Sequence, residues 1–178
     1  MKQLAIQCLA LTMTAMFLSS ALWAQGDKSN RPSPPATATG KVNGATITVN
    51  YSSPGVKGRQ IWGALVPYDQ VWRAGANEAT IFETDKDINV EGKPIKAGKY
   101  SLYAIPGEKE WTIIFNSQTG QWGVKMDGST TEDPAKDVLR VKVKPQKTKA
   151  IQERLTYRVD KNGFALVWEN VEVPVMVK

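Results

Sequence analysis

The residues best suited to chemistry lie between Ser53 and Thr80. This segment places two Trp, two Arg, an Asn and a Glu among turn-forming Pro and Gly residues. A Trp ring offers a flat apolar face, while Arg, Asn and Glu provide directed hydrogen bonds, a combination typical of sites for sugars and small polar ligands. The candidate ligand-binding residues are Arg59, Trp72, Arg73, Asn77 and Glu78, and Trp122 is a further candidate as one wall of the site.

The same segment also permits a purely structural interpretation. Arg73 and Glu78 could form a partly buried ion pair that pins a crossover, because the guanidinium of Arg binds a carboxylate through two hydrogen bonds. Trp62 and Trp72 would then be core residues. On this interpretation the protein is an envelope structural or interaction domain. The question that separates the two interpretations is whether Arg73 and Glu78 face a cavity or each other.

The amino-acid composition excludes several classes of enzyme. The chain contains no His and a single Cys, Cys8. A Ser-His-Asp triad needs His and is therefore excluded. A thiol nucleophile needs Cys and is excluded once Cys8 leaves with an N-terminal signal peptide. Zinc sites built from His and Cys are excluded for the same reason. We expect neither a cofactor nor a metal site.

Carboxylate chemistry survives these exclusions. A glycosidase-like hydrolase needs two acids roughly 5 to 10 Å apart, and Glu78 has Glu83, Asp85 and Asp69 as candidate partners. None of these acids stands in a recognisable acid/base motif, and the sequence does not give their separation. Ser-Lys nucleophiles and all-oxygen Ca²⁺ sites also survive, although the Asp residues are too sparse for a full Ca²⁺ loop. The sequence therefore favours binding over catalysis and assigns no catalytic residue.

The N-terminal residues have the layout of a secretory signal peptide. Lys2 precedes an apolar stretch from Leu4 to Leu18, and small residues follow up to Ala24. Polar residues interrupt the stretch, whereas a membrane anchor needs about 20 continuous apolar residues. We expect a signal peptide at residues 1–24, cleaved after Ala24 or Ala21, and no transmembrane anchor in the mature chain. The mature protein would be periplasmic or extracellular.

Basic residues exceed acidic ones, and some of them are arranged in a stripe. The chain has 23 Lys and Arg against 17 Asp and Glu, for a net charge of +6. Arg140, Lys142 and Lys144 alternate with apolar residues, and Lys147 and Lys149 follow. Such a stripe either holds a polyanion or protects a solvated sheet edge. Because we expect export, edge protection is favoured and no nucleic acid partner is expected.

The rest of the chain has the pattern of short strands separated by turns. Residues 25–35 are polar and rich in Pro, which indicates an extended linker before a single β domain at 36–178. Asp160-Lys161-Asn162-Gly163 indicates a hairpin turn between two alternating stretches, and residues 131–137 allow one helical turn. Strands are expected at Ala45–Tyr51, Ala79–Thr84, Ile88–Val90, Lys99–Ile105, Trp111–Asn116, Val138–Lys144, Leu155–Val159, Phe164–Trp168 and Val171–Val177. About eight to nine such strands predict an all-β antiparallel sandwich or a jelly-roll-like barrel, with little helix.

A series of motifs extends along the chain: Arg31–Pro35, Tyr51–Pro54, Gly58-Arg59, Ile61–Gly63, Val66–Tyr68, Val71–Thr80, Ala97–Tyr103 and Trp111–Asn116. With these motifs the chain resembles a family of exported bacterial domains known only as domain of unknown function 2911. The resemblance runs from about Arg31 to the C-terminus, nearly the whole expected mature chain. It implies a secreted or periplasmic single domain and supplies no activity, cofactor or catalytic residue.

Overall fold

The computed structural model describes residues 28–178. The predicted signal peptide and both of its candidate cleavage sites lie outside these residues. Pro32–Lys178 form one compact unit, and the following description concerns that unit. Within the described range, no helix combines the length and the apolar character that a bilayer crossing requires.

The unit consists of ten strands and one turn of 3-10 helix. The elements in chain order are β1 (Pro35–Val42), β2 (Ala45–Ser52), β3 (Thr80–Thr84), β4 (Ile88–Val90), β5 (Lys93–Ile95), β6 (Gly98–Ile105), β7 (Trp111–Asn116), η2 (Pro134–Lys136), β8 (Asp137–Val143), β9 (Gln146–Asp160) and β10 (Gly163–Met176).

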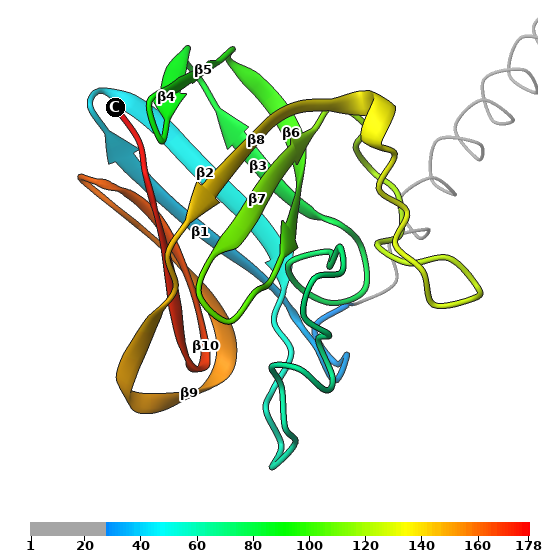
Figure 1. Ribbon diagram of the computed structural model, residues 1–178. Coiled ribbons are helices and arrows are strands. Elements are labelled where there is room, and N and C mark those ends of the chain that lie inside the picture. Colours follow the sequence, from blue (N-terminus) through cyan, green and yellow to red (C-terminus); the bar gives the residue numbers. More distant parts are fainter. Residues whose placement is uncertain (1–27) are drawn as a thin grey trace, which may run out of the picture. The chain divides into compact units, whose positions relative to one another are not determined.

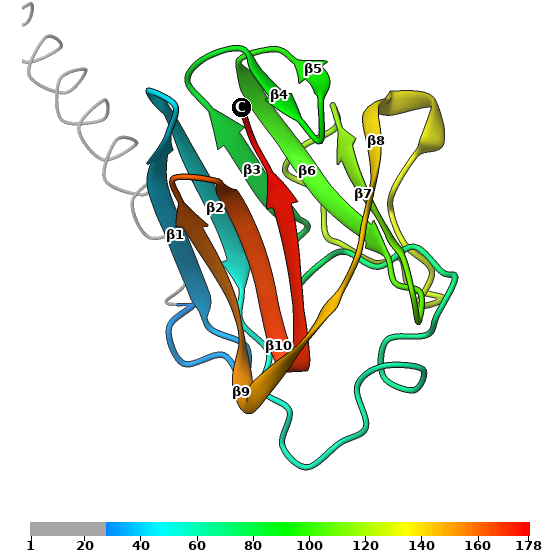
Figure 2. The ribbon, with the colours of Figure 1, turned by 60° about the vertical axis from the view of Figure 1, so that its left-hand side comes forward.

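Two antiparallel layers enclose the core. One layer is a six-stranded sheet in the order β1-β2-β3-β6-β7-β8, and the long β9–β10 hairpin covers one of its faces (Figures 1 and 2). Phe82 and Phe115 of the sheet meet Phe164 of β10. The ring centroid of Phe82 lies 5.1 Å from that of Phe115 and 5.2 Å from that of Phe164. The predicted all-β antiparallel sandwich is confirmed.

Two tight turns are formed by residues with positive φ. Asn43 and Gly44 join β1 to β2, and Glu91 and Gly92 join β4 to β5, with φ positive at all four residues. Positive φ at both central residues is the geometry of a type I′ turn, which matches the twist of the flanking strands. The predicted turn at Glu91-Gly92 is therefore confirmed.

The predicted turn between β9 and β10 is also present, although Gly163 serves another purpose there. Gly163 pairs with Asp160, so Lys161 and Asn162 alone form the loop. A Cβ atom on Gly163 would collide with the carbonyl oxygen of Val175. The glycine is therefore needed for a close approach of two backbone segments.

Four Trp residues pack together at one end of the core. Trp62 lies at the centre of this Trp cluster, with its ring centroid 5.8 Å from Trp72, 4.9 Å from Trp111 and 5.7 Å from Trp168. Trp72 stacks on Trp168 at 6.0 Å and 15°. Edge and stacked contacts of this kind stabilise aromatic pairs beyond the area that they bury. Trp62 and Trp72 are thus core residues, as the structural interpretation expects.

The face of the sheet that points away from the hairpin carries a second, smaller apolar cluster. Tyr103 of β6 and Ile114 of β7 are fully buried there, together with Ala79. Tyr103 and Ile114 are register partners, so their side chains lie side by side on this face. They are buried because the segment before β3 and the segment after β7 cross over them.

Candidate functional site

Two segments distant in sequence form a short antiparallel ribbon over the second apolar cluster. The amide of Ala79 donates to the carbonyl of Gln121 at 3.1 Å, and the amide of Gly123 donates to the carbonyl of Asn77 at 3.0 Å. Glu78 and Trp122 are therefore directly opposite each other between these bonds. In such a pair the two side chains project from the same face. We call residues 77–79 with 121–123 the ribbon.

The inner face of the ribbon is polar and tied to the sheet. Gln121 donates through Nε2 to Ser101 Oγ at 3.1 Å, to Tyr103 Oη at 2.8 Å and to the carbonyl of Gln118 at 3.1 Å. Its Oε1 atom is buried and accepts no hydrogen bond from the described residues. Ser101 and Tyr103 are fully buried, so Gln121 satisfies polar groups that the ribbon removes from water.

Arg73 lies against the inner face of the ribbon. A Cβ atom on Gly123 would collide with the Cδ atom of Arg73, so only Gly leaves room for this side chain. Burial lowers the pKa of the Arg73 guanidinium from its usual value. Its Nε is buried without a hydrogen-bond acceptor. Among the described residues, Arg73 forms no ion pair.

The ion pair that the structural interpretation required is therefore not formed. By the alternation of the ribbon, Glu78 projects from the outer face with Trp122, while Arg73 packs beneath Gly123. Trp122 is 49% exposed and projects from the ribbon into solvent. Arg73 and Glu78 neither pair nor share one face of the ribbon.

The remaining predicted residues make contacts within the protein. Asn77 has a φ of 57° and donates through Nδ2 to the carbonyl of Ser33 at 3.1 Å. Arg59 donates to the carbonyls of Val56 at 3.1 Å and Gly55 at 2.6 Å, within its own loop. Trp72 belongs to the Trp cluster. The structure thus brings Arg73, Asn77, Glu78 and Trp122 together at the ribbon and places Arg59 and Trp72 in other surroundings.

A cleft of about 390 Å³ lies elsewhere on the unit and is lined by none of the six predicted residues. It is bounded by the turn after Arg59, the β6–β7 loop, the β8–β9 connection and the middle of β10. The lining residues are Gln60, Ile61, Trp62, Tyr68, Glu108, Pro145, Gln146, Lys147, Glu169, Asn170 and Val171. We call this the Trp62 cleft.

Irregular pairing of β9 and β10 creates the wall of the Trp62 cleft. The register shifts on both sides of Glu169, which pairs with Gln152. Glu169 has a φ of 54°, in the left-handed region that non-glycine residues seldom adopt. Bulges of this kind bend a strand and redirect its side chains, and they occur frequently beside binding sites.

The segment from Ser53 to Val56 hydrogen-bonds to the part of β9 that lies beside the bulge. Ser53 donates through its hydroxyl to the carbonyl of Leu155, and the amide of Val56 donates to the carbonyl of Glu153. Gly55 forms a bridge with Arg154. In both ribbon views the β2–β3 segment lies at the end of the sandwich where β9 bends (Figures 1 and 2). These contacts anchor the segment that begins at Ser53 to β9. The segment then continues into the turn of residues 60–68, which lines the cleft.

Two aromatic residues contribute to the lining of the Trp62 cleft. Tyr68 lies over Gly63, where a Cβ atom would come within 2.9 Å of the Tyr68 ring. Trp62 lines the cleft, is 8% exposed, and has a buried Nε1 that meets no acceptor among the described residues. The Nε1 of Trp168 is likewise buried without an acceptor among these residues, so this feature belongs to the packing of the Trp cluster.

The charges of the Trp62 cleft are unpaired. Glu108 and Glu169 line it, and neither forms an ion pair or side-chain hydrogen bond with another described residue. Lys147 is the only cation among the lining residues. The sequence analysis missed these acids, because they stand 61 positions apart in the numbering and belong to no local motif. Only the bulge at Glu169, which has no sequence signature, brings them to one cleft.

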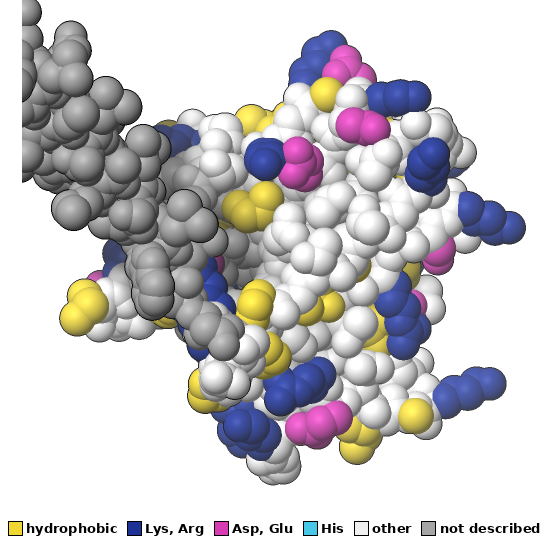
Figure 3. Space-filling model, turned by 180° about the vertical axis from the view of Figure 1, so that it is seen from behind, with side chains coloured by type: hydrophobic (Ala, Val, Ile, Leu, Met, Phe, Trp, Pro, Cys, Tyr) yellow, Lys and Arg dark blue, Asp and Glu magenta, His cyan; other side chains and the backbone are white. Residues whose placement is uncertain are grey.

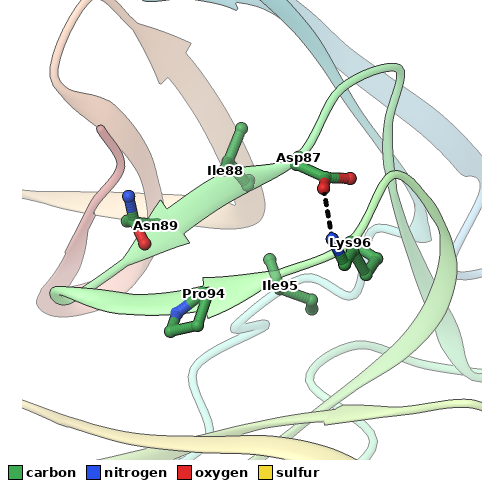
Figure 4. Close-up of a pocket in the computed structure, with 6 residues that line it drawn as sticks. All are labelled: Asp87, Ile88, Asn89, Pro94, Ile95 and Lys96. Atoms are coloured by element: carbon green, nitrogen blue, oxygen red, sulfur yellow. Dashed lines mark hydrogen bonds and ion pairs between the residues drawn. The ribbon is translucent and has the colours of Figure 1, made fainter.

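A second hollow, of about 350 Å³, adjoins the β4–β5 hairpin (Figure 4). It is lined by Asp87, Ile88, Asn89, Pro94, Ile95 and Lys96. Asp87 and Lys96 face each other and form an ion pair at 2.7 Å. Because its charged groups are already paired and it has no aromatic wall, this hollow is a weaker candidate for ligand binding than the Trp62 cleft.

Acidic side chains also gather beside η2, where Arg140 bridges two carboxylates. Arg140 donates to Glu132 Oε1 at 2.8 Å and to Asp137 Oδ2 at 2.6 Å. Burial, and then the charge of Asp137, raise the pKa of the Glu132 carboxyl. Within the described range, no group of three or more acidic residues is placed to hold a metal ion. We regard this cluster as a brace for the chain between β7 and β8.

The basic stripe is partly neutralised by ion pairs. Arg140 is bound by two carboxylates, and Lys142 pairs with Glu110 at 2.6 Å. On the side shown in Figure 3, Lys and Arg side chains are scattered among acidic ones and form no single patch. This arrangement suits a solvated edge better than a polyanion site.

The comparisons with known proteins give one match. The profile of a family described as "Protein of unknown function (DUF2911)" matches residues 33–177. Neither a curated protein nor a solved structure matches the chain.

Proposed function

The chain belongs to the DUF2911 family, and we propose that it binds a small polar or carbohydrate ligand in the Trp62 cleft. The observation that carries the proposal is the lining of this cleft, which combines Trp62 and Tyr68 with side-chain amides and unpaired charges. Its volume of about 390 Å³ lies within the range of small-molecule sites, roughly 300–1,000 Å³.

The lining residues suit a sugar for specific reasons. Tyr68 is partly buried and provides an aromatic surface with a polar end. Gln60, Gln146 and Asn170 each carry a donor and an acceptor, which is what a ring of hydroxyl groups requires.

The cleft is a stronger candidate than the ribbon because it has room for a ligand, whereas residues 77–79 and 121–123 line none of the hollows described above. Gln121 and Asn77 of the ribbon already donate to protein oxygens. Arg73 is covered by Gly123 and borders none of the hollows described above. Trp122 remains an exposed aromatic outside the cleft and therefore serves as a control position.

A carboxylate-based hydrolase is the second candidate function, because Glu108 and Glu169 line the same cleft. The acids named from the sequence are less suitable. None of them, Glu78, Glu83, Asp85 or Asp69, lines the cleft. A hydrolase would release reducing sugar from an oligosaccharide, and this release would cease in both Glu108→Gln and Glu169→Gln.

The test of binding compares two aromatic substitutions. Titration of the protein with a panel of monosaccharides and disaccharides, followed by calorimetry, should give saturable binding that Tyr68→Ala weakens at least ten-fold. Gln60→Ala, at an exposed position, should weaken it without loss of fold. Trp122→Ala removes an aromatic outside the cleft, at a more exposed position than Tyr68, and should leave affinity unchanged. The absence of saturable binding across the panel would refute the proposal.

We also propose that the protein is exported, because its first 24 residues have the pattern of a signal peptide. Mass spectrometry of the protein recovered from the periplasm or the medium tests this. The expected N-terminal residue is Gln25, or Leu22 if cleavage follows Ala21. Recovery of the full chain with an intact Met1 from the cytoplasm would contradict export.

A further inference from the structure

We infer that the ligand of the Trp62 cleft is an amino sugar with a free, positively charged amine. This inference rests on the proposed function and specifies the class of ligand. It starts from the charges of the cleft: Glu108 and Glu169 line it, and Lys147 is the only opposing charge among its residues. The lining therefore has a formal charge of −1, in a chain whose net charge is +6.

The two carboxylates are available to a ligand. Each ion pair of the described range uses an acid other than Glu108 or Glu169. Neither of these two side chains forms a hydrogen bond with a described residue. Glu169 is also half-buried. An ammonium group bound beside this half-buried carboxylate gains more than one bound at an open surface, and the exposed Glu108 adds a weaker attraction.

The aromatic residues favour the same charge. An ammonium group near the face of Trp or Tyr is attracted by the ring, with an energy of about 0.5–1 kcal/mol at exposed sites and about 2 kcal/mol when water is excluded. Trp62 and Tyr68 line the cleft together with the two carboxylates. A carboxylate-bearing sugar would instead face two like charges with a single Lys as its partner.

The neutral groups of the cleft call for hydroxyls beside the amine. Gln60, Gln146 and Asn170 each carry an amide donor and an acceptor that can bind hydroxyls, which a simple alkylamine lacks. Amine and hydroxyls together on one small ring define an amino sugar.

Three related sugars test this inference: glucose, which nearly matches glucosamine in shape, and N-acetylglucosamine, which keeps the nitrogen without its charge. Calorimetric titration should give a dissociation constant for glucosamine at least ten-fold lower than those for glucose and N-acetylglucosamine, which lack the charge. Raising NaCl from 20 to 300 mM should weaken glucosamine binding several-fold and leave glucose binding unchanged, because salt screens the ammonium–carboxylate attraction.

Charge-removing variants complete the test. Glu108→Gln and Glu169→Gln should each reduce the preference for glucosamine by at least three-fold while glucose binding is retained. Glu172→Gln makes the same charge change on β10, three residues beyond Glu169 and outside the cleft lining, and should leave the preference intact. Equal affinities for the three sugars, or a preference that persists in both cleft variants, would overturn the inference and leave the proposed function standing. Failure of every sugar to bind would overturn the proposed function itself.

Discussion

Arg73 and Glu78 are associated with opposite faces of the ribbon, with Arg73 packed beneath Gly123 and Glu78 directly across from Trp122. The segment that holds them is therefore not built around an ion pair. It covers the apolar residues Tyr103 and Ile114 on the outer face of the sheet. At the other end of the same segment, Trp62 and Tyr68 line the Trp62 cleft.

Gly123→Ala should destabilise the protein through Arg73. The new Cβ would overlap the Arg73 side chain, and overpacking of this kind costs about 1–3 kcal/mol. Urea unfolding measures the loss. In the background of Arg73→Ala the same substitution should cost much less, because the colliding atoms are gone. An equal cost in both backgrounds would show that Arg73 does not pack against Gly123.

Gly163→Ala should cost more than Gly128→Ala. Both residues have positive φ, so both substitutions strain the backbone. Only at Gly163 does the added Cβ also meet a carbonyl oxygen, that of Val175, whereas Gly128 has open space. The free energies of unfolding should differ by about 1 kcal/mol or more. Equal losses would contradict the close approach of the β9–β10 turn to the end of β10.

Trp111→Ala and Trp122→Ala should differ strongly in stability. Trp111 is 2% exposed and packs on Trp62, and removing a buried Trp costs about 3–5 kcal/mol. Trp122 is half exposed, and substitutions at such positions usually change stability by about 0.5 kcal/mol or less. Thermal unfolding separates the two. A large loss for Trp122→Ala would mean that the ribbon contributes to the core.

Glu132 should make stability fall as pH rises. Its pKa is raised in the folded protein, first by burial and then by Asp137, so the folded state holds a proton that the unfolded state has already released. Stability is lost as pH rises from the unfolded pKa of about 4.3 through the higher folded value. Glu132→Gln keeps an acceptor for Arg140 and cannot ionise. Relative to wild type it should gain stability between pH 4 and pH 7, and a relative loss over this range would contradict the account.

Asp87 should show the opposite sign. Its pKa is lowered by Lys96 and by the amide of Ala97. The stabilisation is present above the unfolded pKa and disappears as pH falls through the lower folded value. Asp87→Asn should therefore be less stable than wild type at pH 7, and the difference should vanish toward pH 2. A difference that persists undiminished at pH 2 would show that the effect is not due to ionisation.

The strands could be predicted from the sequence where local alternation decides them. Alternating residues indicated the spans of β2 and β8, because burial on one face repeats every second residue. In the hairpin, alternation indicated only Leu155–Val159 of β9, and the expectation of two strands at Phe164–Trp168 and Val171–Val177 was wrong because β10 runs through its bulge as one strand. β1 was not assigned as a separate strand, since its Ala, Thr and Pro residues show no apolar alternation. The Asn43-Gly44 turn signal that follows it could have revealed its pairing with β2.

The sites were harder to predict because they depend on contacts between distant segments. The composition of residues 53–80 drew attention to that segment, and four of the six named residues meet at the ribbon. The pairing of Glu78 with Trp122 follows from tertiary structure, as does the cleft formed by Tyr68, Glu108 and Glu169. Residue types alone did not distinguish a Trp that lines a cleft from one that only fills the core.

The indole N–H resonances of the Trp side chains provide the most direct test of the central claim. Titration with glucosamine should shift the Trp62 Nε1–H resonance, assigned through Trp62→Phe, because a ligand bound in the cleft changes the surroundings of the Trp62 ring that lines it. The Trp122 resonance, which lies outside the cleft, should stay in place. A shift at Trp122 with none at Trp62 would contradict the account and return the site to the ribbon.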